Sequence, residues 1–424
     1  MAHKGRHEFG WSLRLLGSVI FSLRAALTVG AFTLAAVVGA QSRTPATSTA
    51  RLLQLSDVSY EGAFRLPSGS VNGDDFSFGG LPVTFNPATN SLFIGSHRGG
   101  VAEVTIPTPV GSAVVTGLPV AAYRQPFADP TEGHLSQIAS EGVAIDGLLI
   151  FGGRLYGSAA IYYDALNTQT VSHYSRSLTL SEASFRGMYA VGDKGKTGFV
   201  SGYMATVPPE WQASLGGPGI TGQCCIPIVS RTSWGPAAFA WNPASLGTLN
   251  PLPAVPLLYY TSEHPTLGIW AGSSPTYGGT TAMGGIAIIA GTRTALFVGR
   301  NGTGPFCYGN GTSERQLAGS RSLDGEMYCY DPVSSDKGQH AYPYNYQIWA
   351  YDLNDLAAVK AGRKKPWEPK PYGTWPLDLR IPAAVTQIGG VGYDPIRQRL
   401  YLSQMQADQD GYAYRPLIHV FQIK

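Results

Sequence analysis

The chain has few charged residues for its length of 424. Asp, Glu, Lys and Arg make up 13% of it, and the formal net charge is only +3, whereas a typical soluble protein is about 25% charged. A charge so small and so scattered excludes the dense basic surface with which proteins bind nucleic acid or a membrane. We therefore expect neither partner for the mature chain.

Several catalytic motifs are missing as well. The sequence has no Gly-x-Ser-x-Gly, no phosphate-binding loop ending in Lys-Ser or Lys-Thr, no His-Glu-x-x-His and no Cys-x-x-Cys-His. Their absence excludes the most common serine hydrolases, P-loop proteins, zinc proteases and c-type haem proteins. Any function must therefore be inferred from the fold and from the side chains that it brings together.

Long apolar runs are also scarce. The one that stands out lies at the N-terminus. Basic residues precede an apolar run over 25–40, and Val38-Gly39-Ala40 fits a cleavage site of small residues. The run is shorter than the roughly 20 residues of a bilayer-spanning helix. We expect residues 1–40 to be a signal peptide, with an uncleaved anchor as the alternative, and 41–55 to be a linker. The mature protein would then be secreted or periplasmic.

Only four cysteines are present, which fits an oxidising compartment. Cys307 and Cys329 lie in one loop-rich segment, where they are candidates for a disulfide. Cys224 and Cys225 are adjacent, and they form either a vicinal disulfide or two separate pairs with the other cysteines. Four cysteines allow three connectivities, and the sequence leaves all three open.

What the chain does have is a repeat, together with 53 glycines and 30 prolines. Each copy contains small residues, an apolar strand, a turn and a second strand that ends in a small residue. The copies span 79–97, 141–154, 186–204, 284–300 and 389–404. Antiparallel sheets repeated around an axis are typical of a β-propeller. The repeat predicts an all-β fold with five blades, with six to eight as the alternative.

Further alternating segments supply the outer strands of each blade. We expect third strands at 101–107, 159–165, 237–243, 346–353 and 418–423, and fourth strands at 120–127, 171–178, 257–261 and 372–379. The last blade lacks a fourth strand, and residues 58–66 can complete it and close the ring. Residues 56–424 then form one propeller domain, with insertions on one face at about 205–235 and 301–345.

In such a fold, the loops into each first strand and out of each second strand share one face. This face collects acids, imidazoles, guanidinium groups, amides and a phenol. We expect His97, Tyr203, Glu141 and Asp75 as catalytic candidates, and Arg98, Arg154, Arg186, Arg300, His134, His264, Gln387 and Gln404 as ligand-binding candidates.

The excess of Arg and His in this set predicts an anionic, carbohydrate-like ligand, either a small molecule or a polysaccharide, because guanidinium groups bind carboxylates in a bidentate fork. One hypothesis is β-elimination of a uronate, with His97 or Tyr203 moving the proton. Another is glycoside hydrolysis by paired carboxylates such as Glu141 and Asp75. A non-catalytic glycan-binding or structural propeller is the alternative to both.

The architecture resembles that of propeller polysaccharide lyases and furanosidase-type hydrolases. In addition, Ser140-Glu141-Gly142 resembles the metal-binding segment of gluconolactonase-like propellers, in which such a Glu is a ligand. This resemblance implies a metal-dependent, lactonase-like hydrolase that holds a divalent ion such as calcium at Glu141. No other cofactor is expected.

Overall fold

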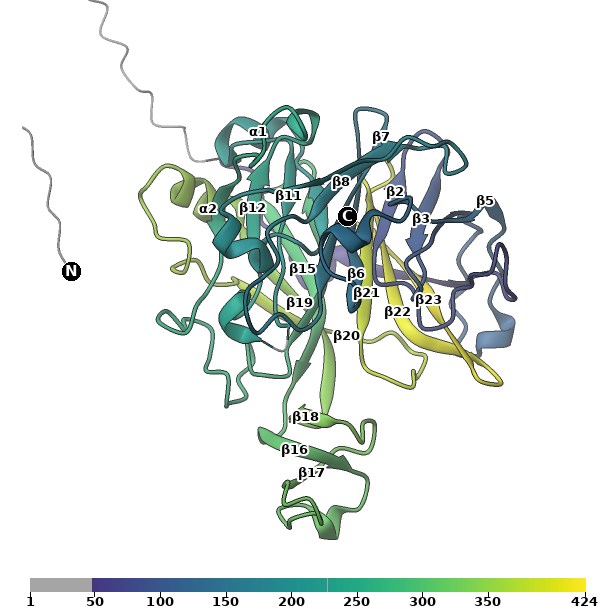
Figure 1. The fold of residues 1–424 in the computed structure, drawn as a ribbon, viewed down its shortest axis with the longest axis vertical. Helices are drawn as coiled ribbons and strands as arrows, with labels where there is room; N and C mark the ends of the chain where they lie inside the picture. The colour runs from purple at the N-terminus through teal and green to yellow at the C-terminus, as the bar shows by residue number, and fades with distance from the viewer. Residues whose placement is uncertain (1–47, 227) are drawn as a thin grey trace, which may run out of the picture. The chain divides into compact units, whose positions relative to one another are not determined.

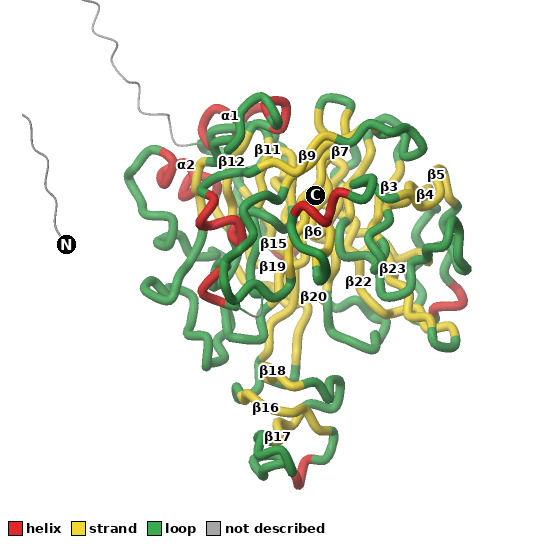
Figure 2. Tube along the Cα trace, viewed as in Figure 1, coloured by secondary structure: helices red, strands yellow, loops and turns green. Residues whose placement is uncertain are grey.

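The computed structural model describes residues 48–226 and 228–424, which form an all-β protein (Figure 1). Strands and loops predominate, and the α-helices are α1 (Pro209–Leu215) and α2 (Leu353–Lys360) (Figure 2). No helix in this part of the chain is long and apolar enough to cross a membrane. The expected signal peptide and residues 41–47 of the expected linker lie outside the described residues. Leu53, in the rest of that linker, is fully buried and donates its N–H to Thr294 Oγ1 (3.0 Å).

Five four-stranded antiparallel sheets account for most of the strands, and each is named here by its first strand. The β2 sheet contains β2 (Val83–Asn86), β3 (Ser91–Gly95), β4 (Val101–Thr105) and β5 (Tyr123–Ala128). The β6 sheet contains β6 (Val143–Phe151), β7 (Arg154–Ile161), β8 (His173–Ser177) and β9 (Arg186–Tyr189). The β10 sheet contains β10 (Met204–Thr206), β11 (Gly219–Thr221), β12 (Ala238–Trp241) and β13 (Val255–Leu258).

The other two sheets are formed by the C-terminal half of the chain. The β14 sheet contains β14 (Ala282–Ile289), β15 (Thr294–Gly302), β19 (Tyr344–Asp352) and β20 (Gly373–Leu377). The β21 sheet contains β21 (Ile388–Asp394), β22 (Arg399–Asp410), β23 (Ala413–Ile423) and β1 (Val58–Arg65). In this last sheet β1 pairs antiparallel with β23, from Val58 opposite Ile423 to Arg65 opposite Leu417. The prediction that an N-terminal strand completes the last sheet is therefore confirmed.

The five first strands contact one another in a cyclic order. β2 lies against β6, β6 against β10, β10 against β14, β14 against β21, and β21 against β2. The hydrophobic clusters follow the same order, because each of the large ones mixes side chains from two neighbouring sheets. Phe85 of the β2 sheet stacks on Tyr401 of the β21 sheet, for example, and Tyr156 of the β6 sheet packs edge-on against Trp241 of the β10 sheet.

Glycines allow the first strands to approach this closely. A Cβ atom on Gly389 would lie 1.9 Å from the carbonyl oxygen of Gly80, and one on Gly284 would lie 2.1 Å from the carbonyl oxygen of Gly389. Both distances are too short for any side chain. Gly390 also donates its N–H to the Gly80 carbonyl (2.9 Å), which joins the β21 sheet to the segment before β2. The small residues that begin the repeats thus lie where neighbouring sheets meet.

The sequences Asn86-Pro87, Asn242-Pro243 and Asp394-Pro395 predict turns, and the structure confirms all three. In each, the side-chain oxygen accepts a hydrogen bond from a backbone N–H two residues further on, as in an Asx-turn. The bonds are Ala88 N to Asn86 Oδ1 (3.1 Å), Ala244 N to Asn242 Oδ1 (3.2 Å) and Ile396 N to Asp394 Oδ1 (2.9 Å).

The strand prediction for the β6 sheet is wrong, because a segment expected to hold two strands holds only one. Residues 141–154 were expected to hold two strands and the turn between them, but β6 continues from Val143 to Phe151 with a bulge between Ile145 and Gly147. The hairpin turn lies instead at Gly152 and Gly153, whose φ values are 55° and 74°. Consequently the segment expected as a third strand at 159–165 overlaps the end of the second strand, β7, and the one expected as a fourth at 171–178 holds the third, β8.

The repeat expected at 186–204 is also wrong. Its first half is β9, the outer strand of the β6 sheet, and its second half includes a 3-10 segment (Lys194–Phe199). The first strand of the next sheet begins only at Met204. Residues 205–235 therefore contain α1 and β11 rather than an insertion between second and third strands, and the segment between β11 and β12 is shorter than expected.

The second expected insertion is the segment between β15 and β19, residues 303–343, which we call the arm. It forms a three-stranded sheet of β16 (Cys307–Thr312), β17 (Tyr328–Tyr330) and β18 (Lys337–His340). Figure 1 shows these strands apart from the labelled strands of the other sheets. A disulfide between Cys307 and Cys329 joins β16 to β17.

We predict that Gly389→Ala destabilises the protein by about 3 kcal/mol or more, because the new methyl group meets backbone that cannot move away cheaply. Gly111→Ala is the matched control, since a Cβ atom there has no neighbour within 4 Å. Chemical denaturation of both variants measures the difference. Equal stability of the two would contradict the close packing of β21 against the chain before β2.

Candidate functional site

A polar cavity of about 470 Å³ opens at the end of the sheets at which the first strands begin. We call this the upper end, although it is on the side of the arm, which points down in Figure 1. The residues that line it include Tyr162, Arg300, Asp331, His340, Tyr344 and Gln387. Tyr162 follows β7 of the β6 sheet, Arg300 belongs to the β14 sheet, Gln387 precedes β21, and Asp331 and His340 belong to the arm. The β6 and β14 sheets are not neighbours in the cyclic order, so the cavity spans the space above the first strands.

Arg300 is the central cation of this cavity. Its Nη1 donates to the Thr386 carbonyl (3.3 Å), and its guanidinium carbon lies 5.1 Å from the centre of the Tyr344 ring. Its Nε is buried and has no hydrogen-bond partner, and Arg300 forms no ion pair within residues 48–226 and 228–424. Burial lowers the pKa of Arg300, although nearby Tyr344 and Asp331 oppose this. An arginine stays charged under such conditions, so Arg300 places a positive charge at the wall of the cavity that no ion pair within the described residues neutralises.

The arm holds a buried network next to Arg300. Asp331 Oδ2 lies 2.8 Å from His340 Nδ1 and accepts a hydrogen bond from the Tyr344 hydroxyl (2.6 Å). His340 Nε2 faces the Asp336 carbonyl oxygen (3.0 Å), which is an acceptor only. Both ring nitrogens therefore face acceptors, and both are satisfied only when the imidazole is protonated.

The pKa values of this pair follow from the geometry. Burial by itself would lower the pKa of His340, but its hydrogen bond and charge interaction with Asp331 outweigh burial and raise it. Burial by itself would raise the pKa of Asp331, but hydrogen bonds from His340 and Tyr344 lower it. Burial and the bond to Asp331 also raise the pKa of Tyr344 well above its usual value. All three groups are committed to one another.

Other polar groups that face the cavity have no protein partner. The side-chain amides of Gln387 and Gln406 and the hydroxyl of Tyr162 make no hydrogen bond to any part of the chain that the structure describes. Gln406 also has a φ of 53°, a left-handed conformation that is costly for a residue with a side chain. It lies in the irregular part of β22 between Gln404 and Asp408, which turns its side chain towards the cavity.

This arrangement is suited to binding an anion that also carries hydroxyl groups. Arg300 offers unpaired donors, and the two amides offer both donors and acceptors. The groups that usually move protons, His340, Asp331 and Tyr344, already have partners. The cavity therefore has the chemistry of recognition more than that of acid–base catalysis.

The expected catalytic residues do not line this cavity. His97 is exposed with its ring edge near Phe78, Asp75 Oδ1 accepts the Ser77 N–H (2.6 Å), and Glu141 is exposed with no polar partner among the described residues. Tyr203 is buried in the core. Its hydroxyl donates to the Ala237 carbonyl and accepts the Ala237 N–H (3.1 and 2.9 Å), and burial raises its pKa well above the usual value.

Two expected binding residues lie at the wrong end of their sheet. Arg154 begins β7 opposite Phe151, and Arg186 begins β9 opposite Ser175. Both positions are at the end where β6 finishes, whereas the upper end of this sheet is at Val143. The expectation that Arg154 and Arg186 converge with Arg300 is wrong, because the hairpin turn was misplaced.

The remaining expected binding residues divide between the cavity and other environments. Arg300 and Gln387 line the cavity. Gln404 lies next to it but is fully buried, and its amide donates to the Tyr346 hydroxyl and the Ile381 carbonyl. The others lie elsewhere: Arg98 donates to the Gly73 carbonyl (2.8 Å), His134 stacks on Phe185, and His264 stacks on Trp367.

The metal hypothesis requires a cluster of ligand side chains. Among the described residues, no group of three or more His, Cys, Asp or Glu side chains is arranged to hold a metal ion. One partly buried carboxyl, that of Asp146, does face the region between the first strands. Burial raises the pKa of Asp146 to about 7, partly opposed by the hydrogen bond from Gln223 Nε2 (3.0 Å). The space beside it is only about 10 Å³, which is about the volume needed for one water molecule.

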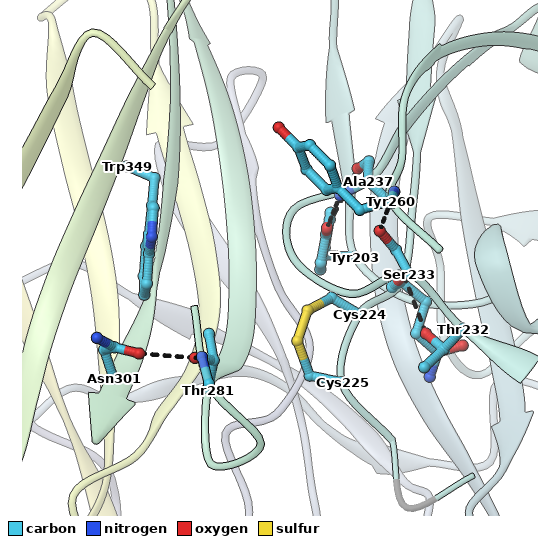
Figure 3. Close-up of a disulfide and its surroundings, with 12 residues drawn as sticks. Tyr203, Cys224, Cys225, Thr232, Ser233, Ala237, Tyr260, Thr281, Asn301 and Trp349 are labelled. Carbon is cyan, nitrogen blue, oxygen red and sulfur yellow. Dashed lines mark hydrogen bonds between the residues drawn. A yellow bond between two sulfur atoms is a disulfide. The ribbon is translucent and has the colours of Figure 1, made fainter. Parts of the chain in front are cut away.

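The cysteines form two disulfides, Cys224–Cys225 and Cys307–Cys329, which settles the pairing that the sequence left open. Figure 3 shows the vicinal disulfide among Tyr203, Ser233 and Tyr260 of the β10 sheet and its loops, with Thr281 and Asn301 drawn on its other side. Cys225 packs against the cluster that contains Tyr203 and Tyr260. The disulfide thus rigidifies the upper end of the β10 sheet, outside the cavity described above.

No protein-family model matches this chain, and no curated protein matches its sequence.

Sequence reasoning missed most of the residues that line the cavity, among them Tyr162, Asp331, His340, Tyr344 and Gln406. Asp331 and His340 belong to an insertion that was expected on this face, so the insertion itself was the available signal. Tyr162 was assigned to a third strand, and Gln406 lies in an irregular segment. Neither position follows from an alternating pattern.

We predict that the stability of the arm depends on pH in two directions. The raised pKa of His340 means that its contribution is complete below about pH 6.5 and is lost as the pH rises through the raised value. The lowered pKa of Asp331 means that its contribution is complete above about pH 3.8 and is lost as the pH falls through the lowered value. Hydrogen-exchange protection factors in β16 and β18 should therefore be highest between these limits.

Asp331→Asn should lower this protection most between these limits and flatten its dependence on pH, because breaking a buried pair costs about 3 kcal/mol or more. Protection that increases from neutral to alkaline pH in the unaltered protein would contradict the assignment of His340 as a cation.

We also predict that Gln406→Gly leaves the unfolding free energy unchanged or raises it by up to about 1 kcal/mol, because glycine relieves the left-handed strain. The same change should weaken ligand binding, since it removes an amide from the cavity. Asn90→Gly is the control: Asn90 has a similar φ of 49° but lies in the turn between β2 and β3. A Gln406→Gly protein that is less stable and binds normally would show that Gln406 is structural.

Proposed function

We propose that the five four-stranded sheets are the blades of a five-bladed β-propeller closed by β1. Support comes from the cyclic contacts of the five first strands, from clusters that join each sheet to the next, and from the pairing of β1 with β23. The arm adds a smaller sheet that belongs to none of the five. Six to eight blades would require further four-stranded sheets.

We propose further that the protein acts outside the cytoplasm. The two disulfides support this location, because disulfides persist mainly in oxidising compartments. The low charge and the abundance of turns fit the same view.

For the activity, we propose that the protein binds an anionic, carbohydrate-like ligand in the cavity beside Arg300. The observation that carries this proposal is the guanidinium of Arg300, which lines a polar cavity and forms no ion pair in the described chain. Its Nη1 donates to the Thr386 carbonyl and its Nε is buried, so the Nη2 group is the donor left for a ligand. A carboxylate at this group would form the charge-assisted hydrogen bonds that arginine favours.

Binding is proposed in preference to catalysis. For β-elimination the cavity would need a free base, and His340 and Tyr344 are held by Asp331, which leaves the phenol of Tyr162. Hydrolysis by paired carboxylates would need two free acids, and Asp331 is committed, which leaves Asp336. The lactonase-like alternative depended on Glu141, which is not among the residues that line the cavity.

We predict that Arg300→Gln weakens the binding of D-galacturonate by roughly 10- to 100-fold, as expected when hydrogen bonds to a charged group are lost. Isothermal titration with galacturonate and with neutral galactose measures the effect. Arg98→Gln is the matched control, because Arg98 also lies at the upper end but outside the cavity.

Equal affinity for galactose and galacturonate, or for the Arg300→Gln and Arg98→Gln variants, would refute the proposal. The same samples can be tested with polyuronates for unsaturated products and new reducing ends. The appearance of either would favour the lyase or the hydrolase reading over binding.

A further inference from the structure

Tyr162 has an unusual environment for a large aromatic side chain. It is 67% exposed, and its ring makes no aromatic contact with the described residues. It nevertheless lines the same cavity as Arg300. Its neighbour Tyr163 is almost equally exposed, at 62%, but is not among the residues that line the cavity.

Tyr162 and Arg300 reach the cavity from different sheets. Tyr162 directly follows β7, and its N–H donates to the Gly142 carbonyl (2.9 Å), which fixes its backbone at the upper end of the β6 sheet. Arg300 lies between Ala282 and Tyr346 in the β14 sheet. Both side chains nevertheless line the same cavity, and the charge interaction with Tyr162 raises the pKa of Arg300, against the larger effect of burial. The cavity thus has a cation and an aromatic ring within reach of one small ligand.

We propose that Tyr162 is a stacking platform, and that the cavity selects carboxylates that carry a ring over open-chain carboxylates. The carboxylate binds at Arg300 and the ring lies against Tyr162. This inference rests on the proposed binding of anions at Arg300 and adds the shape of the ligand. Tyrosine is well suited to this task, because its rigid, amphipathic ring provides contact area at a small entropic cost.

Two kinds of ring fit this chemistry: the apolar face of a pyranose and a planar aromatic ring. The free amides of Gln387 and Gln406 favour the pyranose, because its hydroxyl groups can exchange hydrogen bonds with them. The occupied groups of the arm, Asp331 and His340, contribute shape without offering further free donors. We therefore expect a uronate ring to bind more tightly than an aromatic acid of similar size.

The test measures three probes by isothermal titration: D-galacturonate, open-chain gluconate and 4-hydroxybenzoate. The unaltered protein should bind galacturonate roughly 10-fold more tightly than gluconate, with 4-hydroxybenzoate between them. Tyr162→Ala should reduce this preference to near unity by weakening galacturonate binding, while gluconate binding is unchanged. Tyr162→Phe should retain most of the preference, because the ring remains.

Tyr163→Ala is the matched control and should leave all three affinities unchanged. Thermal unfolding of each variant should match the unaltered protein, because both tyrosines are largely exposed. Equal binding of galacturonate and gluconate by the unaltered protein would overturn the proposal, as would a Tyr162→Ala variant that loses both ligands equally.

These outcomes differ from a failure of the proposed function itself. If anion binding at Arg300 is wrong, none of the three carboxylates will bind, or Arg300→Gln will leave their affinities unchanged. If only the role of Tyr162 is wrong, gluconate and galacturonate will both depend on Arg300 and will not differ from each other. Tighter binding of 4-hydroxybenzoate than of galacturonate would support Tyr162 as a stacking platform but would overturn the preference for a sugar ring.

Discussion

The close approach of neighbouring first strands is the constraint on which the rest of the structure depends. The carbonyl oxygen of Gly80 lies where a side chain on Gly389 would be, and that of Gly389 lies where a side chain on Gly284 would be. Backbone packed so tightly against backbone fixes the distance and the level at which adjacent sheets meet. The upper ends of the sheets are therefore held at a common level, and the loops and side chains there are brought together around one space.

The hydrogen bonds at this upper end distinguish scaffold from site. Beside the cavity, His419 Nε2 lies 2.7 Å from Gln404 Oε1, and its Nδ1 lies 3.1 Å from the Tyr60 hydroxyl. Burial lowers the pKa of His419 to about 3, so this histidine is neutral and each of its nitrogens has one partner. Facing the cavity, by contrast, the side-chain amides of Gln387 and Gln406 have no hydrogen-bond partner in the described chain. A completed network beside an incomplete one is the arrangement expected if the incomplete groups bind the ligand proposed above.

Much of the fold could be predicted from the sequence because its signals are local. Alternation of apolar residues identified most strands of the β2, β14 and β21 sheets, and the Asn-Pro and Asp-Pro turns followed from the chemistry of the Asx side chain. The errors also have local causes. Asp146-Gly147 has the composition of a hairpin turn but forms a bulge, and β9 has the composition of a first strand but pairs as a fourth.

The site was harder to predict because it depends on contacts between distant residues. Arg300 and Gln387 were identified since each lies next to a predicted first or second strand. The pairing of Asp331 with His340 and Tyr344 depends on how the arm folds back on itself, and no pattern of period two encodes this. Tyr162 was assigned to a strand because it continues an apolar and aromatic run, Ala-Ala-Ile-Tyr-Tyr, of the kind that favours strands, although the strand ends at Ile161.

Two separate costs meet at this one cavity, and their coincidence is the strongest physical argument for a ligand. The unpaired Nε of Arg300 costs about 1–3 kcal/mol, and the left-handed backbone of Gln406 costs a similar amount. The native stability of a domain is only about 5–15 kcal/mol, so neither cost is negligible. The two residues come from different strands. Arg300 keeps one hydrogen bond, to the Thr386 carbonyl, and its contact with the Tyr344 ring, and the side-chain amide of Gln406 has no partner in the described chain. A bound carboxylate with hydroxyl groups would add hydrogen bonds to the guanidinium and to the amide, which would help to offset both costs.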